Sequence, residues 1–392
     1  MKSNIFFFYS YRIISRMYFH LPVLFLHLFL SGMGILLTET LLMVYGLSIM
    51  LNTKTNSFLL NYMPQKSVIA LGELLKAIGL FLIIWGTRVG NTNFWLPFLG
   101  QIIGGSGFSL AISSDSSLLR SITSKSSTDL FNNIQSKSQS LMFLSTLLAG
   151  VIGSILFDYE AHWPFYISML ANAMAIISIL LISEEPNLSK QKTSSSKTHN
   201  SIQKPKITAE QGFWMNYYAL SRAFLLASFV GFLPFFFLML QVDIPFFGLV
   251  LSLFSIGAFF SALYSSQLMK VIGINNFIII TMGCTLISMI LFSIFEDFGI
   301  SLIAILLLGF GSGCIRPLTM KNLDLSNLNP QQRASILSTM EQRFSIINAV
   351  LLLVGGYILI EYNFQSLMIQ ITIAYVIAIL IGFTSSTMTS RS

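Results

Sequence analysis

INNFIIITMGCTLISMILFSI, residues 274–294, is a run of 21 residues without an Asp, Glu, Lys or Arg. At about 1.5 Å of rise per residue it forms a helix about 31 Å long, close to the ~30 Å hydrocarbon core of a bilayer. A helix satisfies its backbone hydrogen bonds inside lipid, whereas a single strand does not. The stretch therefore predicts a membrane-spanning helix.

Other apolar runs of comparable length, separated by polar breaks, occur along the whole chain. Of its 392 residues, 54% are hydrophobic and 9% charged, whereas soluble domains carry about 25% charged residues. A water-soluble fold of this composition would expose too much apolar surface. We predict an all-α integral membrane fold with twelve transmembrane helices. The expected spans are residues 6–30, 34–54, 67–86, 94–114, 139–157, 163–182, 212–240, 246–266, 274–294, 299–318, 335–360 and 365–384.

The spans form two groups of six with a polar stretch between them. Residues 183–210, SEEPNLSKQKTSSSKTHNSIQKPKITAE, lack apolar periodicity and are rich in Ser, Lys and Thr. Such a composition is typical of a flexible linker. We expect residues 1–184 to form an N-terminal six-helix bundle, residues 185–210 a cytoplasmic linker and residues 211–392 a C-terminal six-helix bundle.

An internal repeat relates the two groups. GSILFDYE from Gly153 recurs as GYILIEYN from Gly356, and the GGSG ending at Gly107 has a partner in the GFGSG ending at Gly313. The offsets are 203 and 206 residues. Parallel repeats of this kind are a transporter architecture, in which the solute binds at the repeat interface near the membrane midplane.

The charges indicate the orientation. The net charge is +7, and the basic residues gather in alternate loops and in the linker, whereas Arg88 is the only basic residue of the other set of loops. By the positive-inside rule, both termini and the linker lie in the cytoplasm. Basic residues scattered over loops argue against nucleic-acid binding. The Ile-, Lys- and Asn-rich composition suits an AT-rich bacterial genome, so we expect a multi-pass protein of the bacterial inner membrane that acts as a monomer.

Motifs of enzymes and of metal or nucleotide sites are missing from the sequence. Cys284 and Cys314 have no disulfide or metal spacing, and no phosphate-binding G-x-x-x-x-G-K-[ST], H-E-x-x-H or serine elbow occurs. We expect no catalytic residue, no metal ligand and no cofactor.

Three short stretches carry a family resemblance. Residues 57–66, SFLLNYMPQK, occupy the place of the G-x-x-x-D-R-x-G-R-K loop of the major facilitator superfamily, although only Lys66 is retained. Residues 100–107, GQIIGGSG, and 149–154, AGVIGS, resemble glycine elements of its fourth and fifth helices. The chain thus resembles this family, which implies alternating access by two six-helix bundles. The glycines of residues 100–107 and 149–154 let helices pack closely.

A narrower resemblance rests on four further stretches. They are similar to bacterial permeases linked to the secretion of carboxylate siderophores, which implies export of such a solute. The stretches are YRIISRMYFHLPVLFL (11–26), LGELLKAIG (71–79), RPL (316–318) and RASILS (333–338).

The first span holds four basic or titratable residues, Arg12, Arg16, His20 and His27. In one continuous helix at 100° per residue they lie within an arc of about 80°, and such a stripe would face a central cavity rather than lipid. We assign Arg16, His20 and His27 to solute binding. Arg12 alternatively extends to the headgroups, and each histidine alternatively is a hydrogen-bonded packing residue.

The seventh span is the repeat partner of the first and carries Trp214, Tyr218 and Arg222 at intervals of four residues. Arginine offers a fork that pairs with a carboxylate. We therefore assign Tyr218 and Arg222 to the binding of an anionic solute. The alternative is that a carboxylate of the second or eleventh span neutralises Arg222.

Four carboxylates lie in or near spans: Glu39, Glu73, Asp115 and Glu341. Glu73 precedes Lys76 by three residues, which predicts a local ion pair. Glu39 and Glu341 have no such local partner, and a buried carboxyl can carry a proton near neutral pH. We assign these two residues to proton coupling.

Together these features predict a secondary active transporter that moves a small polar, anionic solute by proton-coupled alternating access, with siderophore export as the specific form. The alternatives are an uptake permease for a nutrient or ferric chelate, and a receptor or scaffold that keeps the fold without transport. The altered loop at residues 57–66 favours the last alternative.

Overall fold

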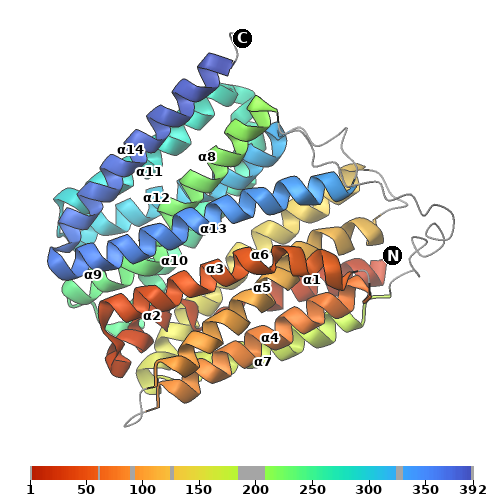
Figure 1. Cartoon of the computed structure of the whole chain (residues 1–392), viewed down its shortest axis with the longest axis horizontal. Coiled ribbons are helices and arrows are strands. Elements are labelled where there is room, and N and C mark those ends of the chain that lie inside the picture. The colour runs from red at the N-terminus through yellow and green to blue at the C-terminus, as the bar shows by residue number, and fades with distance from the viewer. Residues whose placement is uncertain are drawn as a thin grey trace.

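The computed structural model describes residues 2–60, 62–88, 93–123, 128–183, 208–323 and 330–389, and within these ranges the secondary structure is entirely helical (Figure 1). The helices run roughly along one direction, as the apolar spans predict. Ten of them are single crossing helices: α3 (Gly34–Leu59), α4 (Gln65–Gly86), α5 (Trp95–Ile122), α6 (Thr128–Tyr159), α7 (Trp163–Leu180), α10 (Ile244–Ile272), α11 (Ile274–Ile294), α12 (Phe298–Asn322), α13 (Pro330–Glu361) and α14 (Phe364–Thr389).

The first crossing is not the continuous helix expected over residues 6–30. It consists of α1 (Lys2–Ile14), a non-helical segment at 15–20, the short η1 (Leu21–Val23) and α2 (Leu24–Leu28), and the π-helical η2 (Phe29–Met33). Figure 1 shows the chain running from the end marked N through α1 to α2 at the opposite end and returning along α3. We call these two ends of the bundle the α1 end and the α2 end.

The return at the α2 end depends on two glycines. Gly32 and Gly34 have φ values of 88° and 68°, in the left-handed region that other residues rarely adopt. They lie where the sequence predicts the break between the first two spans. Eleven helical stretches of the described residues are long and apolar enough to cross a membrane, the first of them running from Leu21 to Asn52. With α1 counted in a separate first crossing, the described chain has twelve crossings, which agrees with the predicted number.

The seventh crossing is also irregular. It comprises α8 (Ala209–Leu226), the π-helical η4 (Ala227–Phe232) and α9 (Leu233–Met239). Thr208 and Gln211 form a capping box at the start of α8, so this helix begins slightly before the expected start of the C-terminal bundle at 211. Most of the predicted linker, residues 185–207, lies outside the described residues.

Two seams join helices α1–α7 to helices α8–α14. In one seam α3 packs on α13, and in the other α6 packs on α10. A Cβ added at Gly248 of α10 would lie 2.1 Å from the carbonyl oxygen of Gly150 on α6, so the backbones meet almost directly. This contact requires glycine.

Glycines repeat the same packing role in both groups of helices. A Cβ at Gly105 would lie 2.5 Å from the Tyr45 carbonyl oxygen, where α5 crosses α3. At Gly309 it would lie 2.1 Å from the Phe254 carbonyl oxygen, where α12 crosses α10. The close packing expected of the repeated glycine elements is therefore observed.

Candidate functional site

The break in the first crossing frees backbone carbonyls, and side chains of neighbouring helices satisfy them. Ser145 Oγ on α6 donates to the Ile13 carbonyl at 2.8 Å, and Lys76 Nζ on α4 donates to the Ser15 carbonyl at 3.3 Å. Non-helical backbone at membrane depth is tolerated only where protein or a water-filled cavity surrounds it. The break is thus held by tertiary contacts rather than by lipid.

Arg16 lies within this break and is the central feature of the site. Its side chain is buried, with 6% of the residue exposed. Nη1 donates a hydrogen bond of 2.5 Å to the Tyr18 hydroxyl, and the guanidinium lies 5.0 Å from the centre of the Phe108 ring. Arg16 forms no ion pair with a carboxylate in the described part of the chain. Aromatic faces and one hydroxyl compensate its charge only in part.

The charged neighbours of Arg16 are already paired. Arg12 forms a buried salt bridge with Asp115, and Lys76 Nζ lies 2.6 Å from Glu73 Oε2. The predicted Glu73–Lys76 pair is confirmed, whereas the expectation that Arg12 extends to the headgroups is wrong because this residue is 3% exposed. Among these five described side chains there are three cations and two carboxylates, so Arg16 carries the surplus positive charge.

A second polar group lies on α8 and α13. Arg222 Nη1 is 2.9 Å from Glu341 Oε2, and the Tyr218 hydroxyl donates to Glu341 Oε1 at 2.6 Å. The guanidinium also lies 4.3 Å from the centre of the Phe344 ring and hydrogen-bonds the Tyr218 hydroxyl. The alternative expectation for Arg222, neutralisation by a carboxylate of the eleventh span, is the arrangement observed. Arg222 and Glu341 are partly buried, with 29% and 24% of their side chains exposed.

Arg222 and Glu341 lie at a similar distance from the α1 end. Arg222 is 13 residues beyond the start of α8 and Glu341 is 11 beyond the start of α13. At about 1.5 Å per residue these positions are about 20 and 17 Å along their helices from the α1 end.

Irregular helices carry both polar groups. Arg16 belongs to the break at 15–20, and Arg222 lies on α8 just before the π-helical η4. π-segments occur frequently at functional sites. Interrupted helices in corresponding positions of two repeats mark the binding site in many transporters.

The two histidines do not continue a stripe with Arg12 and Arg16, because α1 ends at Ile14. His20 Nδ1 lies 2.9 Å from Ser168 Oγ, and its ring is 6.0 Å from that of Tyr18. His27 is buried, its Nε2 is 2.7 Å from Thr87 Oγ1, and its ring centre is 4.5 Å from that of Phe165. The prediction of one basic stripe is wrong. His27 occupies a hydrogen-bonded packing position, and His20 borders Tyr18.

The surroundings of Glu39 differ from those of the two polar groups. It has 0% exposure, and neither carboxyl oxygen has a hydrogen-bond partner. It points from α3 toward glycines of η4 and α13. Its contacts therefore belong to the seam between the two groups of helices.

Sequence reasoning missed Tyr18 and Phe108, the two aromatic residues against Arg16. Tyr18 could have been noticed because it is two residues from Arg16. Phe108 follows the glycines of α5, and only the packing of α5 brings it to the first crossing.

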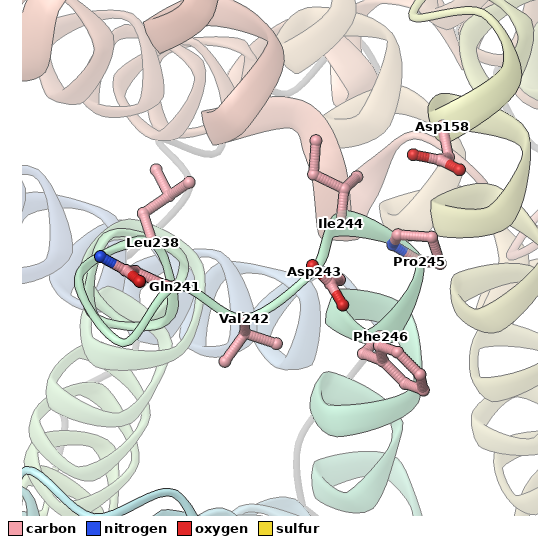
Figure 2. Close-up of a pocket in the computed structure, with 8 residues that line it drawn as sticks. All are labelled: Asp158, Leu238, Gln241, Val242, Asp243, Ile244, Pro245 and Phe246. Atoms are coloured by element: carbon pink, nitrogen blue, oxygen red, sulfur yellow. The ribbon is translucent and has the colours of Figure 1, made fainter.

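A separate pocket of about 520 Å³ opens at the α2 end (Figure 2). It is lined by Asp158 of α6 and by the α9–α10 connection around Asp243, with Phe246 at the start of α10. None of the predicted site residues lines it. Its carboxylates would repel an anion, so it is not the site that Arg16 and Arg222 indicate.

Comparison with known proteins identifies the class. The sequence model of the Major Facilitator Superfamily matches residues 39–340, more than three quarters of the chain. The chain belongs to the Major Facilitator Superfamily, and it is a multi-pass membrane transport protein.

Solved structures show the same fold. The nucleoside transporter NupG is 14% identical, with a TM-score of 0.74 over 98% of this chain and 99% of that one. A bacterial homologue of the iron transporter ferroportin, in an inward-facing state, is 15% identical, with a TM-score of 0.72 over 98% of each chain. No curated protein sequence matches significantly.

Proposed function

We propose that this transporter moves a small carboxylate-bearing solute by proton-coupled alternating access, with Arg16 as the principal anion-binding residue. One observation carries the proposal: Arg16 is buried in the break of the first crossing without a carboxylate partner among the described residues. An uncompensated charge in such a place is costly. A bound carboxylate would supply the missing partner through the two parallel hydrogen bonds that a guanidinium offers.

Arg222, Tyr218 and Glu341 provide the second half of the proposed site. Without solute, Arg222 is held by Glu341 at 2.9 Å. A solute carboxylate that binds Arg222 displaces Glu341, and a carboxyl that has lost its cation takes up a proton more readily. Anion and proton then bind together, which makes Glu341 the proposed coupling residue. His20, beside Tyr18, is proposed to border the solute, whereas His27 supports the site by packing.

The direction of transport has two candidates. If anion and proton bind together, they move in the same direction, which under an inward proton gradient is uptake. Export of a carboxylate siderophore is implied by the sequence resemblance. The glycines of α6, which resemble an element found in many exporters of the family, pack against the first crossing: a Cβ at Gly153 would lie 1.8 Å from the Phe19 carbonyl oxygen. This packing role explains the glycines whatever the direction of transport. The Arg222–Glu341 pair therefore decides between the two candidates, and it favours uptake.

A receptor or scaffold without transport is less well supported. The altered loop keeps Lys66, whose Nζ donates to the Ile182 carbonyl at 3.1 Å at the end of α7. This contact still fixes α4 to α7.

We propose further that the α1 end faces the cytoplasm of a bacterium, that both termini lie there, and that the monomer is the transporting unit.

Arginine variants in proteoliposomes test the binding assignment. Arg16→Ala and Arg222→Ala are expected to lower carboxylate transport at least tenfold at equal amounts of inserted protein. Arg88→Ala is the matched control, because Arg88 is exposed at the α2 end. Transport by Arg16→Ala at the rate of the Arg88→Ala protein would refute the assignment. Right-side-out and inside-out vesicles then distinguish uptake from export.

A further inference from the structure

Glu39 sits in the seam between α3 and α13 in a space that only glycines leave open. A Cβ built at Gly356 of α13 would lie 2.9 Å from Glu39 Cβ and Cγ. A Cβ at Gly231 of η4 would lie 2.9 Å from Glu39 Oε2 and 3.2 Å from Oε1. The carboxyl of a residue in the first group of helices is therefore enclosed by backbone of the second group.

Nothing around Glu39 compensates a negative charge. From η4 and α13 it faces Gly231 and Gly356, and on its own helix its neighbour Thr38 is also fully buried. No titratable or charged side chain of the described residues faces it from α3, η4 or α13. Both of its oxygens lack a hydrogen-bond partner. A carboxylate would lose its hydration here without replacement, so the closed seam accommodates the neutral acid.

The opposite seam shows that close packing of two helices does not require a carboxyl between them. There α6 and α10 meet through Gly150 and Gly248, with Ser154 Oγ 2.6 Å from a Cβ placed at Gly248. Gly153 on α6 and Gly356 on α13 are related by the internal repeat. The seams are thus built from corresponding helices, but among the described residues a buried acid is found in the α3–α13 seam and not in the α6–α10 seam.

Both Glu39 and its contacts lie toward the α2 end. Glu39 is five residues from the start of α3, and Gly356 is five residues from the end of α13. At about 1.5 Å per residue each is about 8 Å from the helix terminus. Opening the transporter at the α2 end separates α3 from α13 and exposes this carboxyl to water.

We propose that Glu39 is a proton-binding latch: the neutral acid keeps the α3–α13 seam closed at the α2 end, and loss of its proton accompanies opening of that end. A ligand that binds one of two conformations shifts the equilibrium toward it, and here the ligand is the proton. The proton is bound while the α2 end is closed and exchanges with the compartment at that end when the seam parts. This role does not require the anion proposed above, nor Glu341.

Spin labels across the α2 end test the latch. Labels on cysteines at Tyr159 and Tyr362, 84% and 64% exposed at the ends of α6 and α13, report the separation of the two groups of helices. Cys284 and Cys314 are first replaced by alanine. Double electron–electron resonance is expected to show a longer distance component that grows from mildly acidic to alkaline pH. In Glu39→Gln the short component persists at every pH.

Two controls isolate Glu39. Glu296→Gln removes an exposed carboxyl at the same end, and Glu341→Gln removes the proposed coupling residue; both are expected to keep the pH response. A pH-independent distance in the otherwise unchanged protein, or a normal response in Glu39→Gln, overturns the proposal. Loss of the response only in Glu341→Gln also overturns it and assigns the effect to the coupling residue.

Infrared spectroscopy provides a measurement that does not depend on the folding of a Glu39 variant. In a Glu341→Gln background at neutral pH, a carbonyl band of a protonated, non-hydrogen-bonded carboxylic acid is expected and resists exchange in heavy water. Absence of this band overturns the proposal.

Discussion

Replacing Glu341 by glutamine removes the charge that holds Arg222 while keeping the size of the side chain and an oxygen that can accept from Tyr218. At the observed 2.9 Å the Coulomb attraction is about 1.4 kcal/mol at the dielectric constant of water and about 6 kcal/mol at an effective value of 20. The pair is about one quarter exposed, so screening and desolvation reduce its net value to about 1–2 kcal/mol. A solute anion no longer has to overcome this attraction in Glu341→Gln.

We therefore expect Glu341→Gln to bind the anion about 5- to 30-fold more tightly than the unchanged protein at alkaline pH, since about 1.4 kcal/mol corresponds to a factor of ten. The unchanged protein should lose affinity as the pH rises, because the anion and a proton are proposed to bind it together. The variant should show a flat profile. Isothermal titration calorimetry in nanodiscs at several pH values measures both effects. Equal affinities and equal pH profiles for the two proteins would refute the competition between Glu341 and the anion.

Two further predictions concern stability. Asp115→Leu removes the carboxylate that pairs with buried Arg12 and should lower the free energy of unfolding by about 3–5 kcal/mol. Arg12→Met combined with Asp115→Leu should restore most of this stability. Denaturation in detergent measures both variants, and an equal loss in the double variant contradicts the argument. Gly153→Ala should sharply reduce folded protein, because its Cβ would meet the Phe19 carbonyl oxygen at 1.8 Å, whereas Gly212→Ala has no atom within 4 Å and should be neutral or stabilising by up to about 1 kcal/mol. Fluorescence-detected size-exclusion profiles compare the two glycine variants, and similar profiles would contradict the packing argument.

The crossings and their number could be predicted because membrane spans are long and their composition is nearly independent of tertiary structure. The turn at Gly32 and Gly34 coincides with the predicted gap between the first two spans. The Glu73–Lys76 pair was predictable because it is local to one helix turn.

The break at residues 15–20 was not predicted, although one local signal was present. Pro22 disfavours helical geometry in the residue before it, and this signal was outweighed by the continuous apolar run. The position of the break depends on Ser145 and Lys76, which are distant in sequence and satisfy the freed carbonyls. The prediction of a single helical stripe of Arg16, His20 and His27 failed with it, whereas the assignment of these residues to solute binding stays a prediction.

The pairing of charges also needed tertiary structure. Arg12 pairs with Asp115 across 103 residues and Arg222 with Glu341 across 119 residues. Sequence patterns identify such residues as costly in a membrane, but they do not indicate which cation lacks a partner. That Arg16 has no carboxylate partner in the described part of the chain, whereas Arg12 and Lys76 have one each, follows only from the packing of α1, α4 and α5.

Solute-triggered proton movement in proteoliposomes tests the central claim most directly. Carboxylates, siderophores, amino acids and sugars are added in turn to vesicles that contain a trapped pH indicator, with Arg16→Ala and Arg88→Ala proteins measured beside the unchanged one. The account predicts a proton signal with a carboxylate-bearing solute, present in Arg88→Ala and absent in Arg16→Ala. A signal with neutral sugars alone, or a carboxylate signal that survives in Arg16→Ala, would contradict it.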